Sequence, residues 1–144
     1  TNPTSTVFEY NTSALANNDN AIAYCFHSVE GYSKVGSYTG NGSTSNPPFV
    51  FTGFRPAWVL IKCSSAGSTN WLLLDSKREG YNSAQDVLFP ESSAAEETNA
   101  AKTVDFLSNG FKVAATTNGS TNASGGTYIF LAFAESPFKF ANAR

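Results

Sequence analysis

Four stretches of the chain show the apolar clustering of β-strands. They are residues 21–28 (AIAYCFHS), 57–63 (AWVLIKC), 71–75 (WLLLD) and 128–134 (YIFLAFA). Each has the length and the apolar content of a β-strand. In residues 21–28 both alternating sets of side chains are largely apolar, which is typical of a strand covered on two faces. We therefore expect all four stretches in buried sheets, with Phe26, Phe130 and Phe133 in the core.

Weaker strand signals lie at residues 32–38, 49–51, 87–89, 103–107 and 111–115. The last two flank Ser108, Asn109 and Gly110, and an Asn-Gly pair between apolar runs predicts a hairpin because both residues tolerate positive φ. Phe106 falls on the core side of this hairpin. Runs of Gly, Asn, Ser and Thr at 39–48, 64–70 and 116–126 predict loops. Helical patterns are confined to one or two turns at 82–85 or 94–101.

About eight to ten short antiparallel strands of this kind predict an all-β sandwich or jelly roll. The 144 residues fit one domain with its own core. Residues 1–20 are polar, and we expect them to form an N-terminal linker or an edge strand. Residues 21–144 then form the sandwich, with 76–100 as a long surface excursion rich in charged residues.

The composition of the chain limits the classes of partner that we expect it to bind. Nine basic and eleven acidic residues give a net charge of −2, and no basic patch stands out, so we expect no nucleic acid partner. The longest apolar runs are far shorter than the roughly 20 residues of a membrane-spanning helix, so we expect no membrane insertion. Only 14% of the residues are charged. The neutral polar remainder resembles secreted and virion β-proteins.

The two cysteines, Cys25 and Cys63, both lie in apolar strand-like runs. Two buried free thiols are the favoured interpretation, and a disulfide between neighbouring strands is the alternative. Cys25, His27 and Cys63 form a weaker zinc hypothesis, because a zinc site needs further ligands. We therefore expect no metal and no cofactor.

Catalytic patterns are missing from the sequence. His27 is the single histidine, and no nucleophile elbow or orienting carboxylate accompanies it. Glycoside hydrolysis needs two acids about 5–10 Å apart across a sugar. Glu96 and Glu97 are adjacent, so on a strand they would point in opposite directions, and the other acids are scattered. We expect no enzyme, with a polysaccharide-degrading spike fragment as the alternative.

One set of side chains is a candidate ligand-binding site. Asp75 and Arg78 follow the strand at 71–75, and Trp71 and Tyr81 bracket them. Aromatic faces of this kind stack on sugar rings, which would make the chain a lectin-like carbohydrate-binding module. The structural interpretation is an Asp75–Arg78 ion pair that closes the strand end, and we favour it because Arg–carboxylate pairs are strong clamps.

Five segments carry a resemblance to a known group of proteins. They are AYCFHSVEGYSKVGSYTGNG (23–42), FVFTGFRPAWVLIK (49–62), WLLLDSKREGYN (71–82), DFLSNGFKV (105–113) and SGGTYIFLAFAESPFKFANAR (124–144). In order and spacing they resemble a domain of bacteriophage and prophage structural proteins of the tail-fibre-associated type. Asp75 and Arg78 match an Asp-x-x-Arg segment of that family. Such domains lie beside lectin-like jelly rolls and have no established reaction.

The resemblance implies a non-catalytic virion structural or adhesion module. A tail fibre or receptor-binding component is the expected role, and a capsid decoration protein is another. The expected location is the virion, assembled in the bacterial cytoplasm. Expected partners are other virion proteins, further copies of the chain in a homotrimer, and a host-surface glycan. Phe138 and Phe140 follow Pro137 beyond the last strand, and an apolar pair there predicts an oligomer interface.

Overall fold

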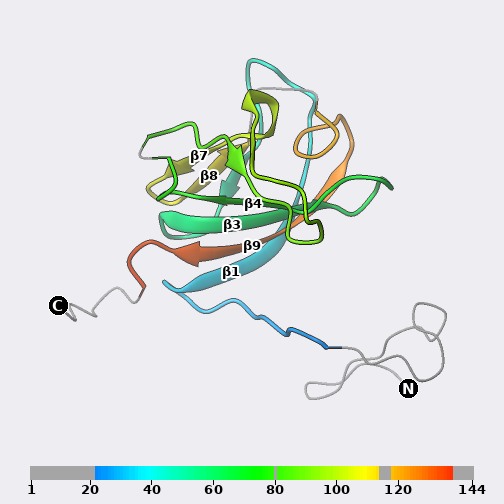
Figure 1. Ribbon diagram of the computed structural model, residues 1–144. Helices are drawn as coiled ribbons and strands as arrows, with labels where there is room; N and C mark the ends of the chain where they lie inside the picture. Colours follow the sequence, from blue (N-terminus) through cyan, green and yellow to red (C-terminus); the bar gives the residue numbers. More distant parts are fainter. Residues whose placement is uncertain (1–21, 80, 114–117, 138–144) are drawn as a thin grey trace, which may run out of the picture.

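The computed structural model describes residues 22–79, 81–113 and 118–137. In this part of the chain there are nine β-strands and one 3-10 helix. The predicted all-β antiparallel sandwich is confirmed, and Figure 1 shows its two main sheets one above the other. No helix among the described residues is long and apolar enough to cross a membrane. The predicted boundary between residues 20 and 21 lies outside the described residues and stays a prediction.

The larger sheet has the strand order β1-β9-β3-β4, and all its pairs are antiparallel. Its strands are β1 (Ser33–Thr39), β9 (Thr127–Ala134), β3 (Pro56–Cys63) and β4 (Leu72–Asp75). Because successive side chains of a strand alternate between faces, Tyr128 and Phe130 point to one side of β9 while Ile129 and Phe133 point to the other. We call these the inner and the outer face of the larger sheet.

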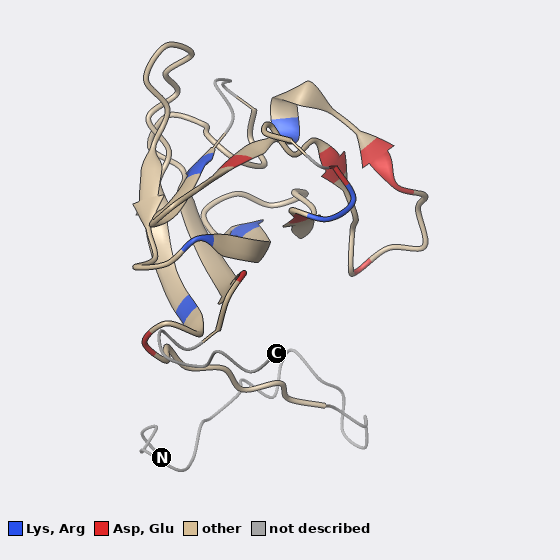
Figure 2. Cartoon of the chain, turned by 90° about the vertical axis from the view of Figure 1, so that its left-hand side faces the viewer, with Lys and Arg blue, Asp and Glu red and all other residues tan. Residues whose placement is uncertain are grey.

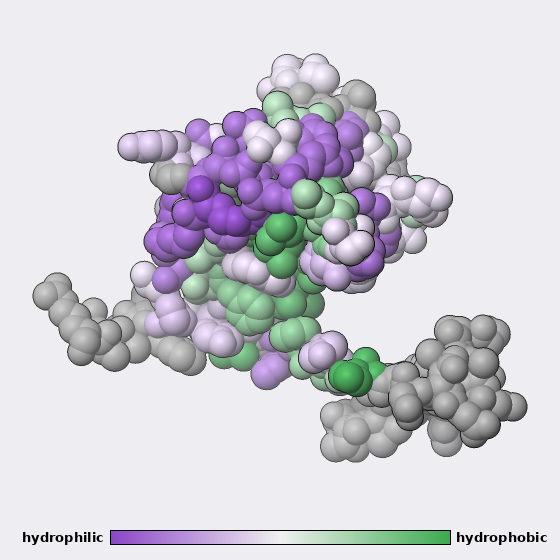
Figure 3. Space-filling model, viewed as in Figure 1, coloured by the Kyte–Doolittle hydropathy of each residue, from purple (hydrophilic) through white to green (hydrophobic). Residues whose placement is uncertain are grey.

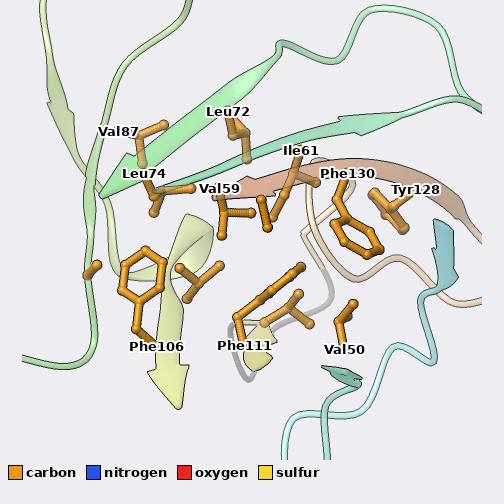
Figure 4. Packing of buried hydrophobic residues seen from close by; sticks show 14 of the residues in the cluster. Val50, Val59, Ile61, Leu72, Leu74, Val87, Phe106, Phe111, Tyr128 and Phe130 are labelled. Atoms are coloured by element: carbon orange, nitrogen blue, oxygen red, sulfur yellow. The ribbon is translucent and has the colours of Figure 1, made fainter. Parts of the chain in front are cut away.

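The smaller sheet covers the inner face. It has the order β2-β8-β7, with β2 (Phe49–Phe51), β8 (Gly110–Val113) and β7 (Val104–Leu107). Figure 4 shows the core between the two sheets, where aromatic side chains of the smaller sheet meet aliphatic ones of the larger. The most buried large side chains are Tyr128, Phe106, Phe111, Ile61, Leu72, Leu74 and Val59. Phe106 and Phe130 lie in the core as predicted.

The excursion at one side of the sandwich holds seven of the twenty charged residues, and Figure 2 shows several of them close together there. It contains the small sheet β5 (Asp86–Val87) and β6 (Glu97–Thr98), followed by the 3-10 helix η2 (Ala100–Lys102). Val87 is fully buried and Leu88 bridges Leu73 of β4, so the excursion is fastened to the larger sheet. The predicted helical turns at 94–101 are replaced by β6 and η2.

The prediction of a buried strand at residues 21–28 is wrong for its described part, residues 22–28. We call this segment the arm. It is extended and exposed, and Phe26, predicted in the core, is 54% exposed. A tight turn pairs Val29 with Ser33 and aligns the arm with β1. The Ser28 hydroxyl then accepts the Val35 amide at 3.1 Å. This side chain occupies the place of a backbone carbonyl, so the ladder stops and the arm leaves the sheet (Figure 1).

Two further core predictions need correction. Phe133 is half-buried on the outer face, where its ring contacts Phe26 and Trp58 edge-on or tilted. Cys63 is buried and free as predicted, whereas Cys25 is free but exposed because it belongs to the arm. The strand alternation was right for Phe133 and Cys63, which lie in β9 and β3. The error concerns which faces another layer of the same chain covers.

The predicted β7–β8 hairpin is confirmed, with Leu107 opposite Gly110 and two residues in the turn. Neither Asn109 nor Gly110 has a positive φ. A Cβ at Gly110 would lie 2.1 Å from the Val50 carbonyl oxygen and 2.8 Å from the Phe49 ring. The glycine is therefore needed because the neighbouring strand β2 passes so close, and not because of the turn conformation.

The loops predicted at 39–48 and 116–126 meet at one end of the sandwich. Asn122 is fully buried between them. Its Oδ1 accepts the amides of Asn41 and Gly42, and its Nδ2 donates to the Ser43 carbonyl. The Tyr38 hydroxyl adds a bond of 2.8 Å to the Thr121 carbonyl. A buried polar side chain with all these partners fixes loop positions without costing unsatisfied groups.

Candidate functional site

Asp75 and Arg78 form the predicted clamp at the end of β4. Arg78 Nε lies 2.6 Å from Asp75 Oδ2, and its Nη2 donates to the Leu73 carbonyl at 3.2 Å. Its Nη1 reaches Glu96 Oε2 across the excursion at 2.5 Å. Asp75 Oδ1 accepts the amides of Lys77 and Arg78. Every nitrogen of the guanidinium therefore has a protein partner, which matches the structural interpretation.

The electrostatics of Asp75 agree with this role. Partial burial by itself would raise the pKa of the Asp75 carboxyl. The hydrogen bonds from Arg78 and from the two amides outweigh burial, and they hold the pKa below its ordinary value. Asp75 is thus ionised at neutral pH and held in place, as a strand-end clamp requires.

Trp71 and Tyr81, the aromatic half of the predicted ligand set, do not lie together. Trp71 lines an apolar groove on the outer face, and Tyr81 stands at a separate polar pocket. Tyr81 is 90% exposed. Neither pocket is lined by Asp75 or Arg78. The four predicted site residues therefore do not form one site.

The polar pocket at Tyr81 has a volume of about 190 Å³. Its walls include Arg55, Glu79 and Asn82. Each of these side chains is hydrogen-bonded or ion-paired to another part of the chain. Arg55 pairs with Glu135 at 2.9 Å and donates to the Phe106 carbonyl. Asn82 donates from its Nδ2 to the Phe106 carbonyl and accepts the Phe106 amide at its Oδ1.

Besides these structural bonds, Glu79 and Ser76 each have an oxygen atom that has no hydrogen-bond partner among the described residues. Glu79 accepts the amides of Gln85 and Asp86 through one carboxylate oxygen. The Ser76 hydroxyl is buried and has no hydrogen-bond partner. Such a group is rare in folded proteins. Together with the exposed Tyr81 ring, it gives the pocket an aromatic rim and a polar floor.

The apolar groove on the outer face is larger, about 610 Å³. The sheet contributes Val35, Leu60, Ile129 and Leu131 to it, and the arm contributes Tyr24 and Phe26. Figure 3 shows this hydrophobic area below the hydrophilic upper half of the body, continuing into the arm. Sequence reasoning did not predict these residues as a surface site, and it placed Phe26 in the core. The signal was present, because β9 is apolar on both alternating faces.

No metal site emerges from the described residues, where no three His, Cys, Asp or Glu side chains gather around one point. Cys25 and His27 are exposed on the arm, while Cys63 is buried in the core of the sandwich. The zinc hypothesis therefore has no geometric support. The predicted interface residues Phe138 and Phe140 lie outside the described residues and stay a prediction.

Comparisons with known proteins place the chain in one family. No curated protein and no solved structure matches it. A family model described as "Domain of unknown function (DUF7483)" matches residues 1–137. This match covers the arm, both sheets and the charged excursion, so the chain belongs to the DUF7483 family.

Proposed function

We propose that the chain is a non-catalytic structural or adhesion module of a bacteriophage particle, acting as a tail-fibre or receptor-binding component. The observation that carries the proposal is that charged side chains stabilise the fold and that carboxylates do not gather in pairs at the pockets of the described residues. Four pockets formed by described residues each hold no more than one carboxylate. Glycoside hydrolysis needs a pair across the sugar.

Several charged side chains instead hold loops and strand ends in place. Arg78, Glu79 and Arg55 are bound to the backbone or to opposite charges, as described above. Asp105 accepts the Ser83 hydroxyl at 2.5 Å and lies opposite Lys112 in the β7–β8 ladder. Such an arrangement stabilises the fold and holds its surface in a fixed shape. The five segments that resemble phage structural proteins give the assembly its proposed identity.

Particle membership is the decisive test. Particles are purified on a density gradient from cells that carry the gene, and their proteins are quantified by mass spectrometry. We expect the chain at a fixed ratio to the major capsid protein. Antibody labelling in the electron microscope then separates a fibre, a baseplate and a capsid decoration position. Absence of the chain from purified particles would overturn the proposal, and release of reducing sugar from host polysaccharide would overturn its non-catalytic part.

Carbohydrate binding is a second candidate, favoured by the pocket at Tyr81. An exposed aromatic ring beside a polar floor that includes the unpartnered Ser76 hydroxyl has the character of a shallow sugar site. A glycan array probed with the whole chain tests it. Tyr81→Ala should abolish any binding, while Tyr24→Ala, which removes another largely exposed ring from the arm, should leave it intact. Binding that survives Tyr81→Ala would exclude this pocket as the site.

A further inference from the structure

The outer face of the larger sheet has the composition of an interior. β9 contributes Ile129, Leu131 and Phe133 to it, and β3 contributes Trp58 and Leu60. Ile129 is 41% exposed although it is flanked by strands on both sides. In antiparallel sheets a solvated face is normally polar. This face therefore has the chemistry of a surface that another layer covers.

The arm has the same character and is just as uncovered. Ile22 is 79% and Tyr24 is 78% exposed. The arm is held only at its root, where Ser33 Oγ donates to the His27 carbonyl at 3.0 Å and the Phe26 ring meets Phe133. Among the described residues, nothing bonds to the backbone from Ile22 to Cys25. Figure 1 shows the arm running below β1 and away from the body.

The outer edge of β1 is open next to the arm. Alternate residues of an edge strand turn their amide and carbonyl groups outward. In β1 the outward residues are Ser33 and Val35, which Val29 and Ser28 satisfy, followed by Ser37 and Thr39. Within the described part of the chain the backbone groups of Ser37 and Thr39 have no partner. An open edge beside a free, strand-like segment is a template for strand addition.

We propose that this face is a self-association surface, in which the arm of one copy lies in the apolar groove and along the open β1 edge of a second copy. The arm cannot fill the groove of its own chain, because Tyr24 and Phe26 already form one wall of it. An identical copy offers the same arm in return. The exchange is then reciprocal, as in a two-fold symmetric interface, with the turn at Val29–Ser33 as its hinge.

Charge favours a second copy as the occupant. Neither the described arm nor the groove lining contains a charged residue, so two copies of net charge −2 meet where no charge has to be buried. The inference holds whether or not the assembly is a virion.

The mass of the full chain in solution is the first test. Light scattering behind a sizing column should give twice the chain mass, or a higher multiple. Tyr24→Ser with Phe26→Ser in the arm should raise the dissociation constant at least about tenfold, and so should Ile129→Lys in the groove. Tyr81→Ser removes an even more exposed ring from elsewhere and should change nothing. Circular dichroism confirms that each variant is folded. A wild-type chain that stays monomeric at millimolar concentration would overturn the proposal.

The β1 edge is tested at Ser37. Proline there removes only an outward-facing amide, which edge strands tolerate, so Ser37→Pro should fold and yet dissociate. Ser37→Ala keeps the amide and should associate like wild type. Equal association of the two variants would show that the edge does not pair.

Mixing the arm variant with the groove variant identifies reciprocal exchange. A mixed dimer keeps one intact arm and one groove whose sheet residues are intact, so association should partly return, although neither variant associates alone. A dimer that uses some other surface, or an arm that folds onto its own β1, predicts no recovery. No recovery on mixing would therefore overturn arm exchange even if the wild-type chain is an oligomer.

Discussion

The two faces of β9 are similar in composition, but within the described chain only the inner face is covered by another sheet. The inner face carries Tyr128, Phe130 and Ala132, and the outer face carries Ile129, Leu131 and Phe133. Phe130 is 4% exposed under the smaller sheet, whereas on the outer side Ile129 is 41% exposed and Phe133 is half-buried, with Leu131 between them at 7%. A strand this apolar on both sides predicts two covering layers. The described chain supplies one full layer and, with the arm, the beginning of another.

The largest effect should separate these two faces directly. Phe130→Ala truncates a core side chain whose ring packs against Phe111, and it should lower the free energy of unfolding by about 3–5 kcal/mol. Ile129→Ala, one residue away on the outer face, should cost less than about 1 kcal/mol in the monomer. Urea denaturation of both variants measures the difference. Similar losses at the two positions would mean that the outer face is covered in solution.

An intermediate loss of stability is expected when a side chain is added on the inner face of β1, where packing is tight. A Cβ at Gly36 would lie 2.9 Å from the Phe130 ring. Gly36→Ala should therefore destabilise the fold by about 1–3 kcal/mol through overpacking. Gly67→Ala, in an open loop where no atom lies within 4 Å, is the matched control and should shift stability by at most about 0.5 kcal/mol. If Gly36→Ala is equally mild, the Phe130 ring has room to move.

The smallest effect concerns the polar clamp at the end of the outer face. Asp75→Asn should cost about 1 kcal/mol at neutral pH, because the pair with Arg78 is partly exposed. The folded-state pKa of Asp75 is lowered, so its contribution is present above the unfolded pKa and is lost as pH falls through the folded pKa. The stability difference between wild type and variant should therefore shrink in acid. A difference that stays constant down to the lowest folded pH would assign it to something other than the carboxylate charge.

Local pattern was enough to predict most of the fold. The strands β3, β4 and β9, the β7–β8 hairpin and the Asp75–Arg78 pair all depend on residues close in sequence. Their alternation and turn residues determine them. The same pattern placed residues 21–28 in a buried sheet, because periodicity reports which faces are apolar and not which chain covers them. The Ser28 hydroxyl that stops the ladder at Val35 has no sequence signature.

The candidate site was less predictable for a related reason. Trp71 and Tyr81 are close to Asp75 and Arg78 in sequence, yet they line different pockets. The groove instead draws residues from the arm, β1, β3 and β9, which are far apart along the chain. Only the register of the larger sheet brings Val35, Leu60 and Leu131 side by side. Pairings of this kind follow from topology and cannot be read from spacing.

The register of the larger sheet also determines how the domain bears mechanical load. Ser33 pairs with Phe133, and the Ala134 amide bonds to the Tyr32 carbonyl at 2.8 Å. The arm and the residues after β9 therefore leave the sheet at the same end. Tension between these two exits acts along the hydrogen bonds of the antiparallel ladder, which run perpendicular to the strands. Such a pull opens β1 from β9 one pair at a time, like a zipper, instead of shearing all the pairs together.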